Sequence, residues 1–143
     1  MADLSVCIAG VTLQNPLIGA SGAVGFGREY AALYPLSTLG GISCKGLTLK
    51  ERPGNPPPRI AETPGGMLNS VGLQNPGVEA FLKEELPWLS TQGTVVIANI
   101  AGSCEADYCA MAERLNDTAV DMIELNISCP NVKEGGVQFG TSC

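Results

Sequence analysis

A cysteine and a lysine are the side chains of this sequence best suited to chemistry. Cys129 lies in the segment Asn126-Ile-Ser-Cys-Pro-Asn131, directly after an apolar run, and the proline that follows it leaves the thiol near a loop. The neighbouring amide and hydroxyl groups can hydrogen-bond a planar polar ligand. A thiolate can remove a proton from such a ligand, preferably at alkaline pH. The alternative is a small buried cysteine with no chemical role.

Lys45 lies inside the apolar run Gly41-Ile-Ser-Cys-Lys-Gly-Leu47. An ammonium group there is costly unless it is paired or faces a polar ligand, so Lys45 is either a site residue or a salt-bridged side chain that extends to solvent. Asn69 lies among small residues that let a backbone approach a ligand closely, although it equally suits an ordinary turn. The glycines of residues 22–27 do not follow the dinucleotide-binding order, which argues against a Rossmann site.

The composition excludes several classes of function. The chain has 143 residues, of which 45% are hydrophobic and 15% are charged, as in a packed globular protein. Its formal net charge of −6 argues against a nucleic-acid-binding or anionic-membrane surface, and no apolar run reaches the ~18 residues of a membrane span. There is no histidine, which excludes a Ser-His-Asp triad and a His-dependent zinc hydrolase. Any acid or base must therefore be Cys, Lys, Tyr or a carboxylate.

The six cysteines predict neither a disulfide framework nor a metal site. The first residues, MADLSVCIAG, lack the basic and apolar segments of a secretory signal, so we expect a reducing, cytoplasmic environment. Cys104 and Cys109 lie on different faces of a predicted helix, and no histidine completes a ligand set. We therefore expect no bound metal.

The predicted elements alternate between strands and helices. Apolar runs bounded by Gly, Pro and Asn indicate the strands, and apolar residues three and four positions apart indicate the helices. Asn75 and Pro76 suit the start of one helix, and Ser103 can cap another. The expected elements are a hairpin of residues 4–8 and 11–13, strands at 16–20, 41–47, 94–101 and 122–127, and helices at 28–36, from 78 and from 103.

This alternation predicts an α/β fold with parallel strands. The run Thr94-Val-Val-Ile-Ala-Asn-Ile-Ala101 is almost wholly apolar, as expected for a strand buried on both faces. Polar side chains collect where strands end, and the carboxyl ends of the strands share one face in a (β/α)8 barrel. The pattern therefore favours a barrel over an open sheet. The polar residues at these ends are Ser21, Lys45, Asn99, Asn126 and Cys129.

Several segments together resemble dihydroorotate dehydrogenase, the flavin enzyme of pyrimidine synthesis. The resemblance extends over essentially the whole chain, and its most specific parts are Asn69-Ser-Val-Gly-Leu73 and Asn126-Ile-Ser-Cys-Pro-Asn131. A cysteine at position 129 resembles the soluble class 1 enzymes. Residues 50–59 resemble subtype B, whose catalytic subunit passes electrons to NAD through a partner subunit. The other matching positions are Ala20-Ser-Gly22, Ser43-Cys-Lys-Gly46 and Asn99.

The resemblance implies FMN-dependent oxidation of dihydroorotate to orotate in UMP biosynthesis. By this similarity Cys129 removes the C5 proton while a hydride leaves C6 for flavin N5, and Lys45 stabilises negative charge between flavin and substrate. The positions implied to bind FMN are Ala20, Ser21, Lys45, Gly46, Asn99 and Asn126. The positions implied to bind the pyrimidine are Lys45, Asn69, Ser70, Val71, Gly72, Leu73, Asn126 and Asn131.

The resemblance also implies the fold and the partners. A (β/α)8 barrel needs about 250 residues, so residues 1–143 are expected to form the N-terminal half of a TIM barrel that starts with a β-hairpin, with the remaining strands absent from this chain. The implied partners are dihydroorotate, a second copy of the chain and an electron-transfer subunit with FAD and an iron–sulfur centre. No nucleic acid or membrane is implied. A related pyrimidine-reducing flavoprotein and an inactive half-barrel fragment are the alternatives.

Overall fold

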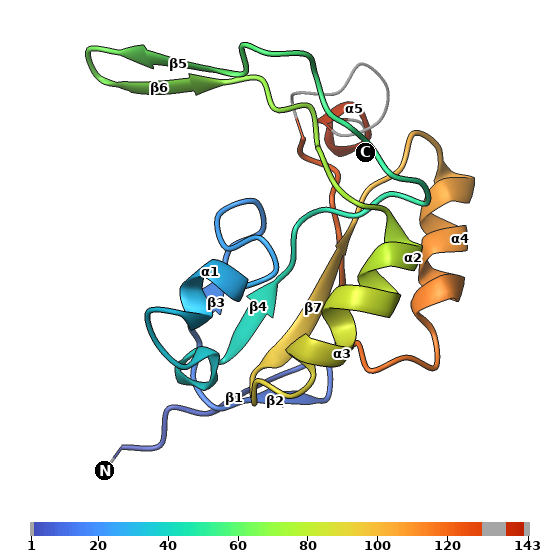
Figure 1. Cartoon of the computed structure of the whole chain (residues 1–143). Helices are drawn as coiled ribbons and strands as arrows, with labels where there is room; N and C mark the ends of the chain where they lie inside the picture. Colours follow the sequence, from blue (N-terminus) through green and yellow to red (C-terminus); the bar gives the residue numbers. More distant parts are fainter. Residues whose placement is uncertain (1, 130–136, 142–143) are drawn as a thin grey trace.

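Four parallel strands form the central sheet of the computed structural model, which describes residues 2–129 and 137–141. The strands lie side by side in the order in which they follow one another along the chain, as β3–β4–β7–β8 (Figure 1). A doubly wound sheet reverses its strand order, whereas a barrel does not. The α/β fold is thereby confirmed, with the winding of part of a barrel. The strands are β3 (Ile18–Gly19), β4 (Gly41–Ser43), β7 (Val95–Ile100) and β8 (Met122–Leu125).

Helices α2, α3 and α4 pack on one face of this sheet (Figure 1). α2, η2 and α3 are consecutive and form one helical segment, whose middle part, η2, is π-helical. Pro87 lies just after this part and has no N–H to donate, so the backbone around it cannot keep a regular α-helical ladder. No helix in the described part of the chain is long and apolar enough to cross a membrane. The helical elements are α1 (Arg28–Ala31), η1 (Leu36–Thr38), α2 (Val78–Ala80), η2 (Phe81–Glu85), α3 (Leu86–Leu89), α4 (Glu105–Leu115) and α5 (Val137–Gly140).

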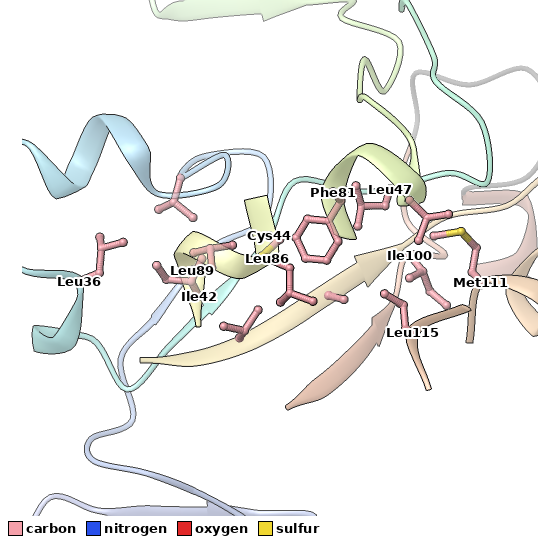
Figure 2. Close-up of a cluster of buried hydrophobic side chains, with 14 residues drawn as sticks. Leu36, Ile42, Cys44, Leu47, Phe81, Leu86, Leu89, Ile100, Met111 and Leu115 are labelled. Carbon is pink, nitrogen blue, oxygen red and sulfur yellow. The ribbon is translucent and has the colours of Figure 1, made fainter. Parts of the chain in front are cut away.

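The main hydrophobic core lies between these helices and one face of the sheet (Figure 2). Because side chains alternate along a strand, every second residue of β7 faces the helices. Ile42 of β4 and Ile100 of β7 belong to this core and are fully buried. Phe81 and Met111 meet them from the helical layer. The residues between them on the strands, including Asn99, therefore lie on the opposite face, so the same strands build a core and a polar face.

Two β-hairpins lie at opposite ends of the sheet (Figure 1). The first pairs β1 (Val6–Ile8) with β2 (Val11–Leu13) at the amino ends of the strands, which confirms the predicted hairpin. The second pairs β5 (Ile60–Thr63) with β6 (Gly66–Asn69) and projects from the carboxyl ends. The sequence patterns do not predict this second hairpin, because its strands are short and mix apolar with polar residues on both faces.

Some predicted helix boundaries are wrong. The helix expected over residues 28–36 ends at Ala31, because the residue before Pro35 is disfavoured in a helix, and the chain then forms the separate turn η1. Helix α4 has Cys104 rather than Ser103 at its N-cap, and no side chain caps it. Several strands are also shorter than expected, since backbone pairing ends before the apolar runs do.

Asn75 joins the segments before and after the second hairpin instead of capping helix α2. The N-cap is Gly77, and Asn75 Oδ1 accepts the N–H of Gly77 at 2.9 Å and that of Thr48 at 3.1 Å. Asn75 Nδ2 donates to the Thr48 hydroxyl at 3.0 Å and to the Leu73 carbonyl at 2.9 Å. The Asn75 and Arg52 backbones exchange hydrogen bonds of 2.9 and 3.0 Å. Asn75 is 4% exposed and is therefore a buried joint between the two segments.

Replacing Asn75 by alanine should lower the free energy of unfolding by about 1–3 kcal/mol for each buried polar group left unpaired. Urea unfolding of the full-length protein, followed by circular dichroism, measures this loss. The matched control is Asn116→Ala at the exposed end of α4, which should change the value by less than about 0.5 kcal/mol. Equal losses in the two variants would contradict the role given to Asn75.

Candidate functional site at the carboxyl ends of the strands

An open hollow of about 440 Å³ lies at the carboxyl ends of the parallel strands. Every strand of the sheet contributes to it, because parallel strands present these ends at one edge. Ala20, Ser21, Asn99 and Asn126, all expected to bind a cofactor, are brought together here. The small and polar residues that line the hollow are Ala20, Ser21, Ser43, Asn99, Glu124, Asn126 and Ser128.

A chain of hydrogen bonds runs along the wall of this hollow. Asn99 Nδ2 donates to the Glu124 carboxylate, and Asn126 Nδ2 donates to Asn99 Oδ1 at 3.2 Å. Asn126 Oδ1 in turn accepts the N–H of Ser128 at 3.3 Å and its hydroxyl at 3.4 Å. The Asn126 carbonyl accepts the Tyr108 hydroxyl at 2.8 Å, which fixes the backbone beside the amide. Asn99 is only 2% exposed, so this series of hydrogen bonds is anchored in the protein interior.

Gly46 lets the chain pass directly against the two amide groups. A Cβ atom at this position would lie 2.9 Å from Asn99 Oδ1, 3.0 Å from Leu73 Cδ1 and 3.4 Å from Asn126 Nδ2. Such distances are shorter than side chains tolerate without displacement, so a glycine is required by this close approach. Gly46, an expected site residue, therefore lies against the amide pair, and Leu73, another expected site residue, lies against Gly46.

Ser43 and Glu124 also line the hollow, and neither was expected there. Ser43 is 1% exposed, and its Oγ atom has no hydrogen-bond partner among the described residues. Glu124 pairs in register with Asn99 across β7 and β8, which places both side chains on one face. In the sequence, each of these residues is a polar side chain inside an apolar strand. To recognise them as site residues, one must know which face of the sheet each side chain occupies, and that depends on the strand register.

Lys45 borders a neighbouring hollow instead. Its side chain lines a hollow of about 330 Å³ together with Phe26, Glu51, Arg52 and other residues. The Lys45 N–H donates to the Gly25 carbonyl at 2.9 Å, which ties the loop after β3 to the chain after β4. Among the residues that the structure describes, no carboxylate pairs with the Lys45 ammonium group. Lys45 is half-buried.

Residues 69–73 lead from the second hairpin to the hollow. Asn69 ends β6. The Ser70 N–H donates to a backbone carbonyl at 2.7 Å across the projecting arm, which consists of the second hairpin and the two segments that flank it. The Val71 carbonyl accepts a backbone N–H at 3.0 Å, and a Cβ atom on Gly72 would lie 2.7 Å from the Asn55 side chain. These residues lie along the arm, and Leu73 is the member of the segment that packs against Gly46.

Cys129 lies one residue beyond the hydrogen-bond chain and is half-buried. Asn131, expected to contact the pyrimidine, lies outside the described residues. The cysteines of the described chain are free thiols. Within residues 2–129 and 137–141, no group of three or more Cys, Asp and Glu side chains gathers where it could hold a metal ion.

Cys44 is a thiol in a contrasting environment. It is fully buried in the core against the helices. Burial raises the pKa of the Cys44 thiol to about 12, and repulsion from the Glu85 carboxylate adds to the increase. Cys44 therefore stays protonated at neutral pH and is unsuited to act as a base or nucleophile.

The chain is similar to dihydroorotate dehydrogenases. The family model with this description matches residues 3–143. The catalytic subunit of dihydroorotate dehydrogenase B (NAD(+)) from Petrotoga mobilis is 60% identical over 141 residues, which cover 99% of this chain and 47% of that subunit. The same subunit from Alkaliphilus oremlandii is 56% identical over 140 residues, with coverage of 98% and 46%. The chain thus spans about half the length of the curated relatives it matches.

Solved structures show the same similarity. The crystal structure of DHODH from Eimeria tenella in complex with ferulenol matches with a TM-score of 0.72 at 25% identity, and covers 92% of this chain and 38% of that one. The ligand-free structure matches with a TM-score of 0.70 at 26% identity, with coverage of 92% and 40%. The four-stranded sheet thus corresponds to part of a TIM barrel, as expected for an N-terminal half.

Replacing Gly46 by alanine should displace the Asn99 and Asn126 amides and lower the free energy of unfolding by about 1–3 kcal/mol. The control is Gly65→Ala in the projecting hairpin, where a Cβ atom meets nothing within 4 Å. Urea unfolding of the two full-length variants in parallel measures the difference. A Gly46→Ala variant as stable as the control would show that the amide pair moves aside freely.

Iodoacetamide at pH 8 should alkylate the exposed Cys104 and leave Cys44 unmodified, because Cys44 is both buried and protonated at that pH. Peptide mass spectrometry after a timed reaction measures the two sites in the same sample. Unfolding in guanidinium chloride should make them react at similar rates. Alkylation of Cys44 in the folded protein would contradict its assignment to the core.

Proposed function

The chain belongs to the dihydroorotate dehydrogenase family, and from this premise we propose that it supplies half of a protein that oxidises dihydroorotate to orotate. The observation that carries the proposal is the gathering of Asn99 and Asn126 beside Gly46, at the edge where a barrel holds its active site. The activity is proposed for the full-length protein, because the chain spans about half the length of its relatives.

We infer that FMN is the cofactor, and the residues present suit it. The Ser43 hydroxyl is buried at the hollow without a partner in the described chain, and Gly46 lets the backbone pass directly against the two amides of its wall. The NH₂ group of a carboxamide can donate to a C=O group of a flavin ring edge. The proposed FMN-binding residues are Ala20, Ser21, Lys45, Gly46, Asn99 and Asn126.

Cys129 is the proposed base. Its thiolate takes the proton from C5 of dihydroorotate, and its position next to Ser128 attaches it to the end of the hydrogen-bonded chain. The chemistry that bound FMN would supply is acceptance of the hydride from C6. Lys45 brings a positive charge to the negative charge that develops in the reaction, and its ammonium group has no carboxylate partner in the described chain.

Residues 69–73 are proposed to hold the pyrimidine, together with Lys45, Asn126 and Asn131. Side-chain amides can match both the N–H and C=O groups of a pyrimidine ring. The backbone bonds of the projecting arm and the Asn75 joint support this segment, because they fix its path beside residues 52–59. The position of the arm at the carboxyl ends of the strands agrees with this role (Figure 1).

The relatives named as NAD(+)-linked catalytic subunits support a partner subunit that receives the electrons. We propose that this partner carries FAD and an iron–sulfur centre, as the resemblance implies. A homodimer of the catalytic chain and a cytoplasmic location stay predictions. Native mass spectrometry of the full-length protein, expressed with the gene that encodes its partner, would test the assembly.

Replacing Cys129 by alanine should lower dihydroorotate-dependent turnover by about 10²–10⁴-fold, because the general base is removed, and should leave FMN bound. Loss of flavin absorbance on addition of dihydroorotate measures the reaction, and the flavin spectrum after gel filtration measures binding. The control is Cys104→Ala, which removes an exposed thiol at the N-cap of α4 and should leave both measurements unchanged.

Turnover by the Cys129→Ala variant close to that of the unmodified protein would contradict the role of the base. A full-length protein that carries no flavin and does not respond to dihydroorotate would contradict the proposed function. Uracil with NADPH, offered in place of dihydroorotate, tests the pyrimidine-reducing alternative in the same assay.

A further inference from the structure

We propose that Glu124 is a positioning residue that orients the carboxamides of Asn99 and Asn126, and so makes the wall of the hollow a hydrogen-bond donor surface. The inference rests on the proposed function, because the ligand that meets this surface is the flavin or the pyrimidine. The ligand must turn carbonyl oxygens or unprotonated ring nitrogens toward the two amides.

The first constraint on the amides comes from Glu124. The register of β7 and β8 places Glu124 directly opposite Asn99, and both line the hollow. The Glu124 carboxylate accepts a hydrogen bond from Asn99 Nδ2. An ionised carboxylate cannot donate, so Asn99 must turn its NH₂ group toward Glu124. Its Oδ1 atom must then face Asn126.

The second constraint comes from the other end of the chain. Asn126 Oδ1 accepts the Ser128 N–H at 3.3 Å, and a backbone N–H can only donate. Asn126 must therefore turn its NH₂ group toward Asn99, where Nδ2 and Oδ1 are 3.2 Å apart. In this series of hydrogen bonds, the Glu124 end only accepts and the Ser128 end only donates, so both amides have a single allowed orientation.

The orientation decides what the wall presents to a ligand. Each amide oxygen already accepts a hydrogen bond within this series, whereas each NH₂ group keeps one hydrogen that no described residue uses. The unpaired Ser43 hydroxyl lines the same hollow and can donate as well. A ligand edge that carries C=O groups matches the donors that the two amides present.

Glu124 can be replaced without disturbing the core. It is exposed, and its strand is held by backbone pairing with β7 at four positions, from Met122 to Leu125. A glutamine in its place has nearly the same shape, but its neutral Oε1 atom accepts a weaker hydrogen bond from Asn99 than a carboxylate does, and its NH₂ group accepts none. Glu124→Gln therefore weakens the restraint on the Asn99 amide while it preserves the packing.

The decisive measurement is FMN affinity of the full-length apoprotein, followed by quenching of flavin fluorescence. Glu124→Gln and Glu124→Ala should each weaken FMN binding by about tenfold to a hundredfold, as expected for a lost hydrogen bond to a charged group. The matched control is Glu113→Gln on the exposed surface of α4, which should bind FMN as the unmodified protein does. All three variants should keep the unmodified thermal unfolding midpoint within a few degrees.

The outcomes separate an orienting role from a packing role. Loss of affinity in both Glu124 variants supports the proposal. Normal FMN affinity and normal KM for dihydroorotate in Glu124→Gln would overturn it, whatever Glu124→Ala does. A raised KM for dihydroorotate with unchanged FMN affinity supports the donor surface and identifies the pyrimidine as the ligand that it meets.

A second readout needs no ligand and no turnover. The side-chain NH₂ signals of Asn99 and Asn126 in ¹⁵N–¹H spectra, assigned with Asn→Asp variants, should both shift in Glu124→Gln and stay unchanged in Glu113→Gln. Unshifted signals would overturn the inference. If the unmodified protein neither binds FMN nor oxidises dihydroorotate, the proposed function fails, and the NH₂ signals still decide whether Glu124 orients the amides.

Discussion

The two-residue alternation of strand β7 is the constraint on which the rest of the structure depends. Ile100 points into the core against the helices, while its neighbour Asn99 is turned to the opposite face and lines the hollow. Both side chains are nearly inaccessible to solvent. Because one strand serves both faces, the packing of the helical layer also sets the position of the amide. The stability of the core and the precision of the site are therefore linked through a single backbone.

On the polar face, the orientation of the amides depends on which of their partners donate and which accept, more than on the number of hydrogen bonds. A carboxylate at one end and a backbone N–H at the other leave the two amides between them one orientation. Gly46 completes this arrangement, since any side chain there would collide with the Asn99 amide. The projecting arm is attached by Asn75, whose hydrogen bonds to Thr48 and Leu73 hold the segment proposed to bind the pyrimidine.

Features that depend on local interactions could be predicted from the sequence, whereas features that depend on contacts between distant segments could not. The strand at 94–101 and the first hairpin were predictable because their apolar residues and glycines act locally. The second hairpin was not, because its strands pair with each other and bury no face. Asn75 suited a helix cap equally well, and only its contacts with Thr48 and Leu73 show a different role.

The sequence by itself determined which chemical groups are present and their order, namely a thiol, a lysine and amides after apolar strands, with no histidine. It thereby determined the α/β class and the family. Only the tertiary structure decided that Asn99 and Asn126 share a hydrogen bond, that Ser43 and Glu124 join them, and that Lys45 borders a separate hollow. The physical reason is that these contacts depend on strand register and facing. Register is set by backbone pairing between distant segments, which no local pattern of residues encodes.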